Sequence, residues 1–420
     1  MKRLFTIIAF AASVMVMQAQ RFVGGDISLL DKYETNGALY YDHDGNAITS
    51  PLDYFKNEGL NSMRVRLFVN PANATDAEKG EGVCQDLEFV KKLGKRIKDA
   101  GFSLMLDFHY SDTWADPAKQ YTPTDWLALD DEALKTKIYE YTKECLTQMV
   151  AAGATPDFIQ TGNEISYGLL WGDRNASSSW KRYYAGQSGN AERFVALLRR
   201  AGQACREVCP KAKIVLHTER VPDASYLTNF YTDMKKAGLD YDIIGLSYYP
   251  YYHGNLDKLE KALTSLEGAF PDKKIMIVET GYYHAWQPTD VSYDFSATYP
   301  INDEGQKLFT DALIDRLKTH GSVIGLYWWF MEANEYGLDW STKRVTDGWY
   351  NAGLFDNQTG RAMAAMSSLK DFLDTSAGIN GVKTSATSPH EIYSLDGRRL
   401  SESDLSRGGL YIIDGKKVVK

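Results

Sequence analysis

Two glutamates stand at the ends of short apolar segments that are typical of buried strands. Glu164 closely follows the segment 157–161, and Glu279 ends the segment 274–279. A carboxylate next to a buried strand is costly unless it has a partner or a purpose. Cleavage of a glycosidic bond needs such a pair, because one carboxylic acid protonates the leaving oxygen and one carboxylate attacks the sugar carbon. We predict that these two are that pair, although a glutamate taken at random is more often a surface group or a salt-bridge partner.

Polar and aromatic side chains stand at the ends of the other apolar segments. They are Arg66, His109, Asp112, Trp114, His217, Tyr249 and Trp329, with Asn163 directly before Glu164. Arg64 and Arg66 share one face of a predicted strand, and Arg66 is nearer its C-terminal end. A lone histidine in such a place is more often structural, but several aligned ends facing two glutamates favour a functional role. For Trp329, a platform for a sugar ring and packing in the core are both open.

Eight apolar segments and the helical patterns between them indicate how these side chains are positioned. The predicted strands are 22–28, 63–68, 102–109, 157–161, 213–217, 242–247, 274–279 and 323–330. Apolar strands that alternate with amphipathic helices indicate a parallel sheet, and eight such units predict a (β/α)8 barrel. An open doubly wound sheet is disfavoured because no glycine-rich phosphate loop follows the first strand. In a barrel, the C-terminal strand ends meet at one face, where catalytic groups lie.

Composition excludes several classes of protein. The chain has 420 residues, with 47 Lys and Arg against 55 Asp and Glu, a net charge of −8. Hydrophobic residues at 44% can form a large core, so the chain is not a disordered protein. The negative charge gives no general attraction for nucleic acid. The 27 Tyr and 9 Trp suit flat, amphipathic ligands such as sugars.

The two ends of the chain differ from its middle. Residues 1–19 predict a signal peptide, with a basic start, an apolar run and a cleavage site near Ala19. The run is too short for a membrane anchor, so we expect an exported protein without a membrane span. The barrel is predicted over 20–375. Residues 376–420 are predicted to be a linker and a small β-like tail, with strands at 391–394 and 409–413 and a turn between 414 and 415.

The strand-end motifs resemble a known family of glycoside hydrolases. The run 107–117, together with Gly162-Asn163-Glu164, Ser247-Tyr248-Tyr249-Pro250 and Glu279-Thr280-Gly281, is similar to glycoside hydrolase family 53. These are endo-β-1,4-galactanases of the clan A barrels, and the resemblance covers roughly 20–375. The Asn-Glu end is shared across the clan, whereas the long run 107–117 is specific to the family. The tail is similar to the C-terminal sorting-type segments of exported Bacteroidetes proteins.

The resemblance implies a role for each matching position. Glu164 matches the acid/base, Glu279 the nucleophile, and Asn163 the residue that holds the sugar 2-hydroxyl. Tyr249 would keep the nucleophile oriented and ionised. Arg66, His109 and His217 match polar groups around the carboxylates, and Asp112, Trp114 and Trp329 match parts of the glycan cleft. The implied function is a retaining arabinogalactan endo-β-1,4-galactanase that needs no cofactor. We expect a monomer, and the net charge of −8 fits a neutral polysaccharide substrate.

Two further features concern metals and cysteines. Some bacterial members of the family carry calcium between the last two loops of the barrel, where this chain has Asp290, Asp294, Asp303, Asp339 and Asp347. Without EF-hand spacing, we interpret these as solvated loop acids rather than as a calcium site. The four cysteines, Cys84, Cys145, Cys205 and Cys209, lack zinc spacing, and we interpret them as buried free thiols.

Three other functions remain as alternatives. Another clan A glycanase would cut mannan or cellulose, which the run 107–117 argues against. A non-catalytic glycan-binding barrel would be expected to lack one carboxylate, whereas both are present. A phosphate-dependent metabolic barrel enzyme is the most distant alternative, given the export signal and the absence of a late glycine-rich loop.

Overall fold

The computed structural model describes residues 20–346 and 348–374, and four short strands between 392 and 419. The chain divides between Asp374 and Thr375 into two compact units. The predicted signal peptide and Asp347 lie outside the described residues. Within the described part of the chain, none of the helices combines the length and the apolar character needed to cross a bilayer.

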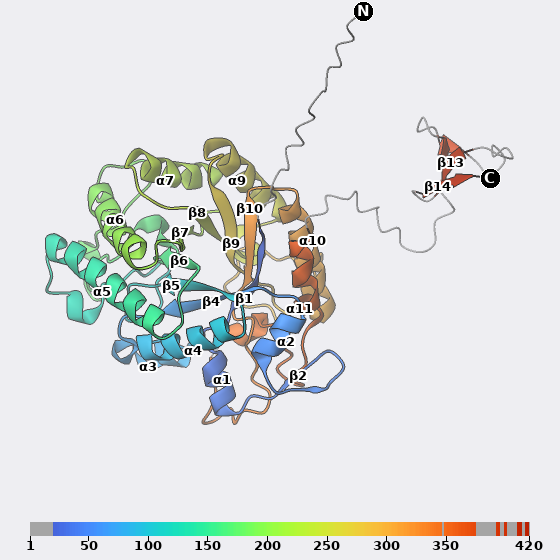
Figure 1. The fold of residues 1–420 in the computed structure, drawn as a ribbon, viewed down its shortest axis with the longest axis horizontal. Helices are drawn as coiled ribbons and strands as arrows, with labels where there is room; N and C mark the ends of the chain where they lie inside the picture. The colour runs from blue at the N-terminus through green and yellow to red at the C-terminus, as the bar shows by residue number, and fades with distance from the viewer. Residues whose placement is uncertain are drawn as a thin grey trace, which may run out of the picture. The chain divides into compact units, whose positions relative to one another are not determined.

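Eight parallel strands of the first unit close into a barrel, as predicted (Figure 1). They are β1 (Phe22–Asp26), β4 (Ser62–Leu67), β5 (Ser103–Phe108), β6 (Phe158–Thr161), β7 (Lys213–Thr218), β8 (Ile243–Tyr248), β9 (Lys274–Thr280) and β10 (Val323–Trp328). Each strand pairs with its neighbour along the chain, and β1 closes the ring against β10. The barrel is therefore the frame that brings the eight strand ends to one face.

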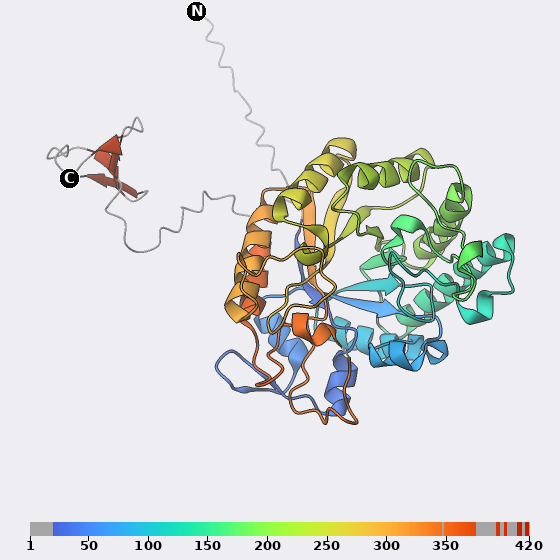
Figure 2. The same ribbon diagram turned by 180° about the vertical axis from the view of Figure 1, so that it is seen from behind.

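Helices form the outer layer of the barrel (Figure 2). They are α1 (Leu30–Asn36), α2 (Pro51–Asn57), α3 (Asp76–Gly80), α4 (Leu87–Asp99), α5 (Asp131–Ala151), α6 (Ala191–Val208), α7 (Ala224–Lys236), α8 (Pro250–His253), α9 (Leu256–Ala269), α10 (Asp303–Lys318) and α11 (Ala364–Ser368). Several of these helices begin at a residue whose side chain caps the first turn. In α2, Ser50 accepts a hydrogen bond from the Asp53 N–H and proline follows it. In α5, Asp130 caps the N–H of Ala133.

The side chains inside the barrel change from apolar to polar along the strands. The lower part of the barrel is filled by an apolar cluster that includes Met105, Phe158, Val215, Ile243 and Tyr327. Successive residues of a strand point to opposite faces, so the residue two positions further along points inward again. On three strands that residue is polar: Asp107, Gln160 and His217. The apolar cluster thus forms one layer inside the barrel, and these polar residues form the next layer toward the C-terminal strand ends.

The second unit contains a four-stranded antiparallel sheet in the order β12-β11-β13-β14. Its strands are β11 (Ile392–Ser394), β12 (Arg399–Leu400), β13 (Leu410–Ile413) and β14 (Lys416–Val419). Two of them match the predicted tail strands. The strands β12 and β14 were not predicted because each is short and rich in charged residues, which hides the apolar alternation. A short hairpin, β2 (Tyr40–Tyr41) with β3 (Ala47–Ile48), lies in the first unit.

All four cysteines lie in the described residues and are free thiols. Three are buried, and Cys84 is partly exposed. Burial raises the pKa of Cys145 to about 12 and that of Cys209 to about 11, so both stay protonated at neutral pH. The interpretation as buried free thiols is confirmed for Cys145, Cys205 and Cys209, whereas Cys84 is free but only partly buried.

Candidate active site

Glu279 is the second-last residue of β9, and three side chains contact its carboxylate. Its Oε1 is 2.9 Å from Nη2 of Arg64. Its Oε2 accepts hydrogen bonds from the Tyr249 hydroxyl at 3.1 Å and from the Ser247 hydroxyl at 3.4 Å. Only 4% of the residue is exposed. Burial raises the pKa of Glu279, and the Arg64 charge and the Tyr249 hydrogen bond oppose that rise.

Glu164 faces Glu279 across the barrel mouth. It follows β6 in a left-handed conformation, with φ 48° and ψ 52°. This conformation is unfavourable for a residue other than glycine and is found mostly at functional sites. The backbone N–H of Glu164 donates to Nδ1 of His217 at 3.3 Å, which helps to hold the turn. One carboxylate oxygen of Glu164 and one of Glu279 lie within 4.8 Å of each other.

The two carboxyl groups have different surroundings. When the pair carries one proton, that proton is on Glu164. Burial raises the pKa of Glu164 well above its usual value, and the negative charges of Glu279 and Glu219 raise it further. Glu279, in contrast, faces the Arg64 guanidinium. The first group to ionise is therefore Glu279, and Glu164 keeps the proton. This split supplies an acid and a nucleophile at neutral pH.

Arg64 links Glu279 to polar residues inside the barrel. Besides Glu279, its guanidinium bonds to Asp26 at 3.0 Å, to Asp107 at 2.7 Å and to the side-chain oxygen of Asn163 at 2.9 Å. It is fully buried, and the three acids keep it charged. Arg66 was predicted among the polar groups around the carboxylates, but it is Arg64 that contacts Glu279, while Arg66 bonds to Asp26. Arg64 precedes Arg66 by one inward position on β4 and lies opposite Met105 of β5.

Asn163 and His217 complete the wall around the carboxylates. The side chain of Asn163 donates to the Ala115 carbonyl at 2.8 Å, and its oxygen accepts from Arg64, which fixes its orientation. His217 contacts Gln160 through Nδ1 at 2.9 Å and Ser247 through Nε2 at 2.8 Å. Burial and the Arg64 charge lower the pKa of His217 well below its usual value, so the ring is neutral.

His109 supports the site from below through Asp107. Its Nε2 lies 3.1 Å from Asp107, and its Nδ1 accepts the N–H of Ala115 at 3.0 Å. These contacts place the ring proton on Nε2. Burial lowers the pKa of His109, and Asp107 only partly offsets this. With 1% of the residue exposed, His109 orients Asp107 and the 107–117 loop rather than facing the cavity.

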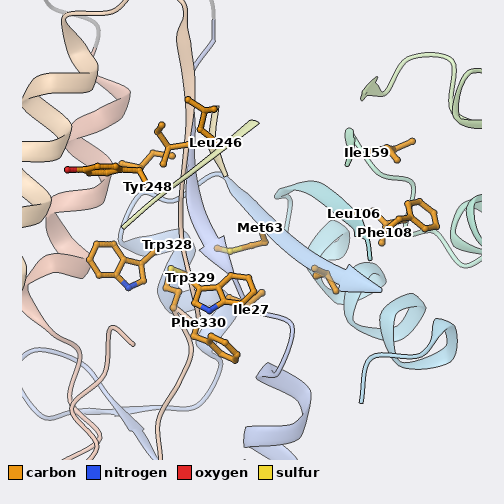
Figure 3. Close-up of a cluster of buried hydrophobic side chains, with 14 of the residues drawn as sticks. Ile27, Met63, Leu106, Phe108, Ile159, Leu246, Tyr248, Trp328, Trp329 and Phe330 are labelled. Atoms are coloured by element: carbon orange, nitrogen blue, oxygen red, sulfur yellow. The ribbon is translucent and has the colours of Figure 1, made fainter. Parts of the chain in front are cut away.

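Trp114 and Trp329 form an aromatic pair at the rim. Their ring centroids are 6.0 Å apart, and both residues line the cavity. The Arg66 guanidinium stacks on Trp114 at 4.6 Å and on Trp329 at 5.1 Å, while its Nη1 bonds to Asp26 at 2.6 Å. Arg66 is fully buried, so it supports the two rings from behind. Figure 3 shows the rings of Trp328 and Trp329 on opposite sides of the strand, and both belong to the buried hydrophobic cluster.

A cavity of about 440 Å³ connects these groups. The predicted residues that line it are Trp114, Asn163, Glu164, Tyr249, Glu279 and Trp329. Asp112 is not among its lining residues. Its Oδ2 accepts hydrogen bonds from the Asn73 side chain at 3.0 Å and from the N–H of Thr124 at 2.9 Å. Asp112 borders a separate cavity of about 170 Å³, so the structure places it as a tie between loops.

A family model described as glycosyl hydrolase family 53 matches residues 22–369, most of the chain. The chain belongs to glycosyl hydrolase family 53. Similar proteins include a probable arabinogalactan endo-beta-1,4-galactanase A of Neosartorya fischeri, 33% identical over 73% of this chain and 82% of the relative. An endo-beta-1,4-galactanase of Bacillus subtilis is 27% identical over 83% and 84%. The structure of the Ignisphaera aggregans GH53 catalytic domain is 30% identical, with a TM-score of 0.71 over 83% of this chain and 95% of that domain.

Membership of family 53 makes the protein an endo-acting glycoside hydrolase.

Four residues of the site were not predicted from the sequence. They are Arg64, Asp107, Ser247 and Glu219. Each lies on a strand or directly after one, within two residues of a predicted site residue. The signal that could have found them is the inward-facing period of two on β4, β5, β7 and β8.

The acids considered for calcium make local contacts. Asp294 accepts the N–H of Ser296, Asp303 that of Ala364, and Asp339 that of Ser341, while Asp290 accepts the Tyr252 hydroxyl. Among the described residues, the one group of acids and histidines close enough to hold an ion is Glu164, His217 and Glu279. The structure therefore does not gather the described loop acids into one site.

Proposed function

We propose that this family 53 hydrolase cuts internal β-1,4-galactosidic bonds of pectic galactan and arabinogalactan with retention of anomeric configuration. The substrate is supported by the names of its relatives from Bacillus subtilis and Neosartorya fischeri. The observation that carries the retaining mechanism is the approach of Glu164 and Glu279 within 4.8 Å. Retaining enzymes place their carboxyl groups about 5–5.5 Å apart, whereas inverting enzymes leave room for a water at roughly 6.5–9.5 Å.

The first step forms a covalent intermediate. The ionised Glu279 attacks the anomeric carbon as the glycosidic bond breaks, and Glu164 transfers its proton to the departing oxygen. Loss of that proton leaves Glu164 ionised. At the same time the negative charge of Glu279 is consumed in the new ester bond, so the two carboxylates never carry full charges together.

The second step returns both groups to their starting states. Glu164 removes a proton from an incoming water, whose oxygen attacks the anomeric carbon and releases Glu279. Arg64 and Tyr249 then stabilise the restored carboxylate. Asn163, whose amide is held by Ala115 and Arg64, would present its remaining N–H to the sugar 2-hydroxyl.

Proton NMR of the first product formed from pectic galactan tests this proposal. The expected first product is the β-anomer at the new reducing end, and the Glu279→Ala variant should bind galactan without cleaving it. Initial release of the α-anomer, or cleavage of mannan or cellulose with galactan inert, would contradict the proposal. Binding without product in the wild-type protein would instead support a glycan-binding barrel.

We also propose that the protein is exported and acts as a monomer. The basic start and apolar run of residues 1–19 support cleavage near Ala19. Mass spectrometry of the mature protein should show an N-terminus at Gln20. Retention of residues 1–19 in the mature form would exclude this, and size-exclusion chromatography tests the monomer.

A further inference from the structure

A third buried carboxyl group borders the cavity beside the proposed acid/base. Glu219 directly follows β7, and 6% of it is exposed. Its Oε1 accepts the Ser166 hydroxyl at 2.5 Å. Its Oε2 is buried and has no hydrogen-bond partner. An unpartnered buried carboxylate oxygen is costly, and such cases call for an explanation. Glu219 lines the same cavity as Glu164 and Glu279.

Strand order places Glu219 on one particular side of the bond to be cut. Glu279 and Trp329 stand at the ends of the adjoining strands β9 and β10, while Glu164 and Glu219 follow the adjoining strands β6 and β7. Trp329, which lines the cavity beside Glu279, is the ring on which the sugar attacked by Glu279 would stack. The sugar that leaves must lie beside the acid that protonates its oxygen, which is the side of Glu164 and Glu219.

We propose that Glu219 is a substrate-binding residue for the leaving-group sugar, with its free Oε2 accepting a hydrogen bond from a sugar hydroxyl. The inference rests on the proposed galactanase function. A hydroxyl-rich ligand is the chemistry that satisfies a buried acceptor without bringing a charge into the site. Because the bond would be charge-assisted, it is stronger than one between neutral groups.

The surroundings of Glu219 support a fixed position for this acceptor. Ser166 is held at both ends, since its hydroxyl donates to Glu219 and its carbonyl accepts the Tyr226 hydroxyl at 3.0 Å. The Arg220 guanidinium stacks on the rings of Tyr226 at 5.0 Å and Tyr167 at 5.5 Å. Burial raises the pKa of Glu219 to about 7, and its hydrogen bond from Ser166 and the Arg220 charge oppose that rise.

The test uses competition between two acceptors for one intermediate. An aryl β-galactobioside with a good leaving group loads the enzyme without placing a sugar beside Glu164. Water then competes with added galactobiose, and Glu164 activates both acceptors. The ratio of transfer to hydrolysis therefore reports sugar binding on the leaving-group side and is insensitive to the proton affinity of Glu164.

Glu219→Gln should lower that ratio about tenfold, because a neutral amide replaces the charged acceptor. It should also lower kcat/KM for galactotetraose. Ser166→Ala is the control, since it removes the tie to Oε1 but keeps the carboxylate. The proposal predicts that its ratio stays near that of wild type.

Three results would overturn the assignment. One is an unchanged ratio in Glu219→Gln. Another is an equal fall in Ser166→Ala, which would show that Glu219 acts only as a structural tie. A third is a wild-type enzyme that cleaves galactan yet transfers nothing to galactobiose. A wild-type enzyme that leaves galactan uncut would instead count against the proposed function itself.

Discussion

The Arg64 guanidinium lies 2.9 Å from Oε1 of Glu279, and both side chains are almost fully buried. The same Nη2 atom also lies 2.7 Å from Asp107 and 2.9 Å from Asn163. One nitrogen therefore stabilises the nucleophile and orients the residue next to the acid/base. At the same time Nη1 of Arg64 bonds to Asp26, so the guanidinium uses two nitrogens, whereas the ammonium of a lysine has only one.

Arg64→Lys should lower kcat about 100-fold or more while keeping the charge. Lysine loses at least two hydrogen bonds to charged groups, each worth about 1.5–3 kcal/mol. Assays on galactan measure the activity, and thermal unfolding measures the accompanying loss of stability. Arg199→Lys, at an exposed arginine that bonds to the Ala237 carbonyl, is the matched control and should be neutral. Near-normal turnover in Arg64→Lys would remove Arg64 from the mechanism.

Tyr249→Phe should move the acid limb of the pH profile to higher pH. The Tyr249 hydroxyl donates to Oε2 of Glu279 and favours its ionised form, so removing it raises the pKa of Glu279. Activity requires that group to be ionised, and it is lost when the pH falls through this pKa. The profile of kcat/KM from about pH 4 to 9 measures the shift.

The alkaline limb gives the internal control for this experiment. It reports loss of the proton from Glu164, so it should move little in Tyr249→Phe. Tyr139→Phe removes a surface hydroxyl that donates to Glu207 and should leave both limbs in place. An acid limb that stays put, or moves to lower pH, would contradict the role given to Tyr249.

Glu164→Ala should lose galactan hydrolysis but keep the ability to form the intermediate from an activated aryl galactoside. A good leaving group needs no protonation, so the first step proceeds through Glu279. The second step lacks its base and becomes limiting. Added azide should restore turnover and give a β-galactosyl azide, which mass spectrometry and NMR identify. An α-linked azide would point to the wrong nucleophile.

The fold was predictable because each barrel strand contains an apolar segment and helical patterns separate these segments. The predicted strand 323–330 extends two residues beyond β10, because Trp329 and Phe330 continue the apolar run after the strand has ended. Phe330 has a φ of 51°, and the pattern of residue types does not predict this left-handed conformation. The boundaries thus depend on backbone geometry at the site rather than on hydrophobicity.

The carboxylate pair was also predictable, whereas its supporting cation was not. Arg64 and Arg66 are alternatives on one face of β4, and sequence favours the one nearer the strand end. The choice depends on the stagger between strands, which puts Arg64 opposite Met105 and Arg66 opposite Asp107. Asp112 was misplaced for a related reason, since a loop side chain can turn toward Asn73 instead of the cleft.

His320 gives a prediction about stability that is independent of the active site. It lies between two glutamates, with Nδ1 2.9 Å from Glu267 and Nε2 3.0 Å from Glu260. Burial lowers its pKa, but the two glutamates outweigh burial and raise it above the usual value. A raised folded-state pKa stabilises the protein fully below the unfolded value of about 6.5, and this contribution is lost as the pH rises through the folded value.

His320→Asn should therefore lower the melting temperature more at pH 6 than at pH 9. The expected pH-dependent part is at most about 1 kcal/mol, because both glutamates are partly exposed to solvent. Calorimetry at the two pH values measures it. The control is the same substitution in a Glu260→Gln, Glu267→Gln background, where the two pH values should give equal effects. A larger loss at pH 9 than at pH 6 would mean that the neutral ring, rather than the charged one, stabilises this corner of the barrel.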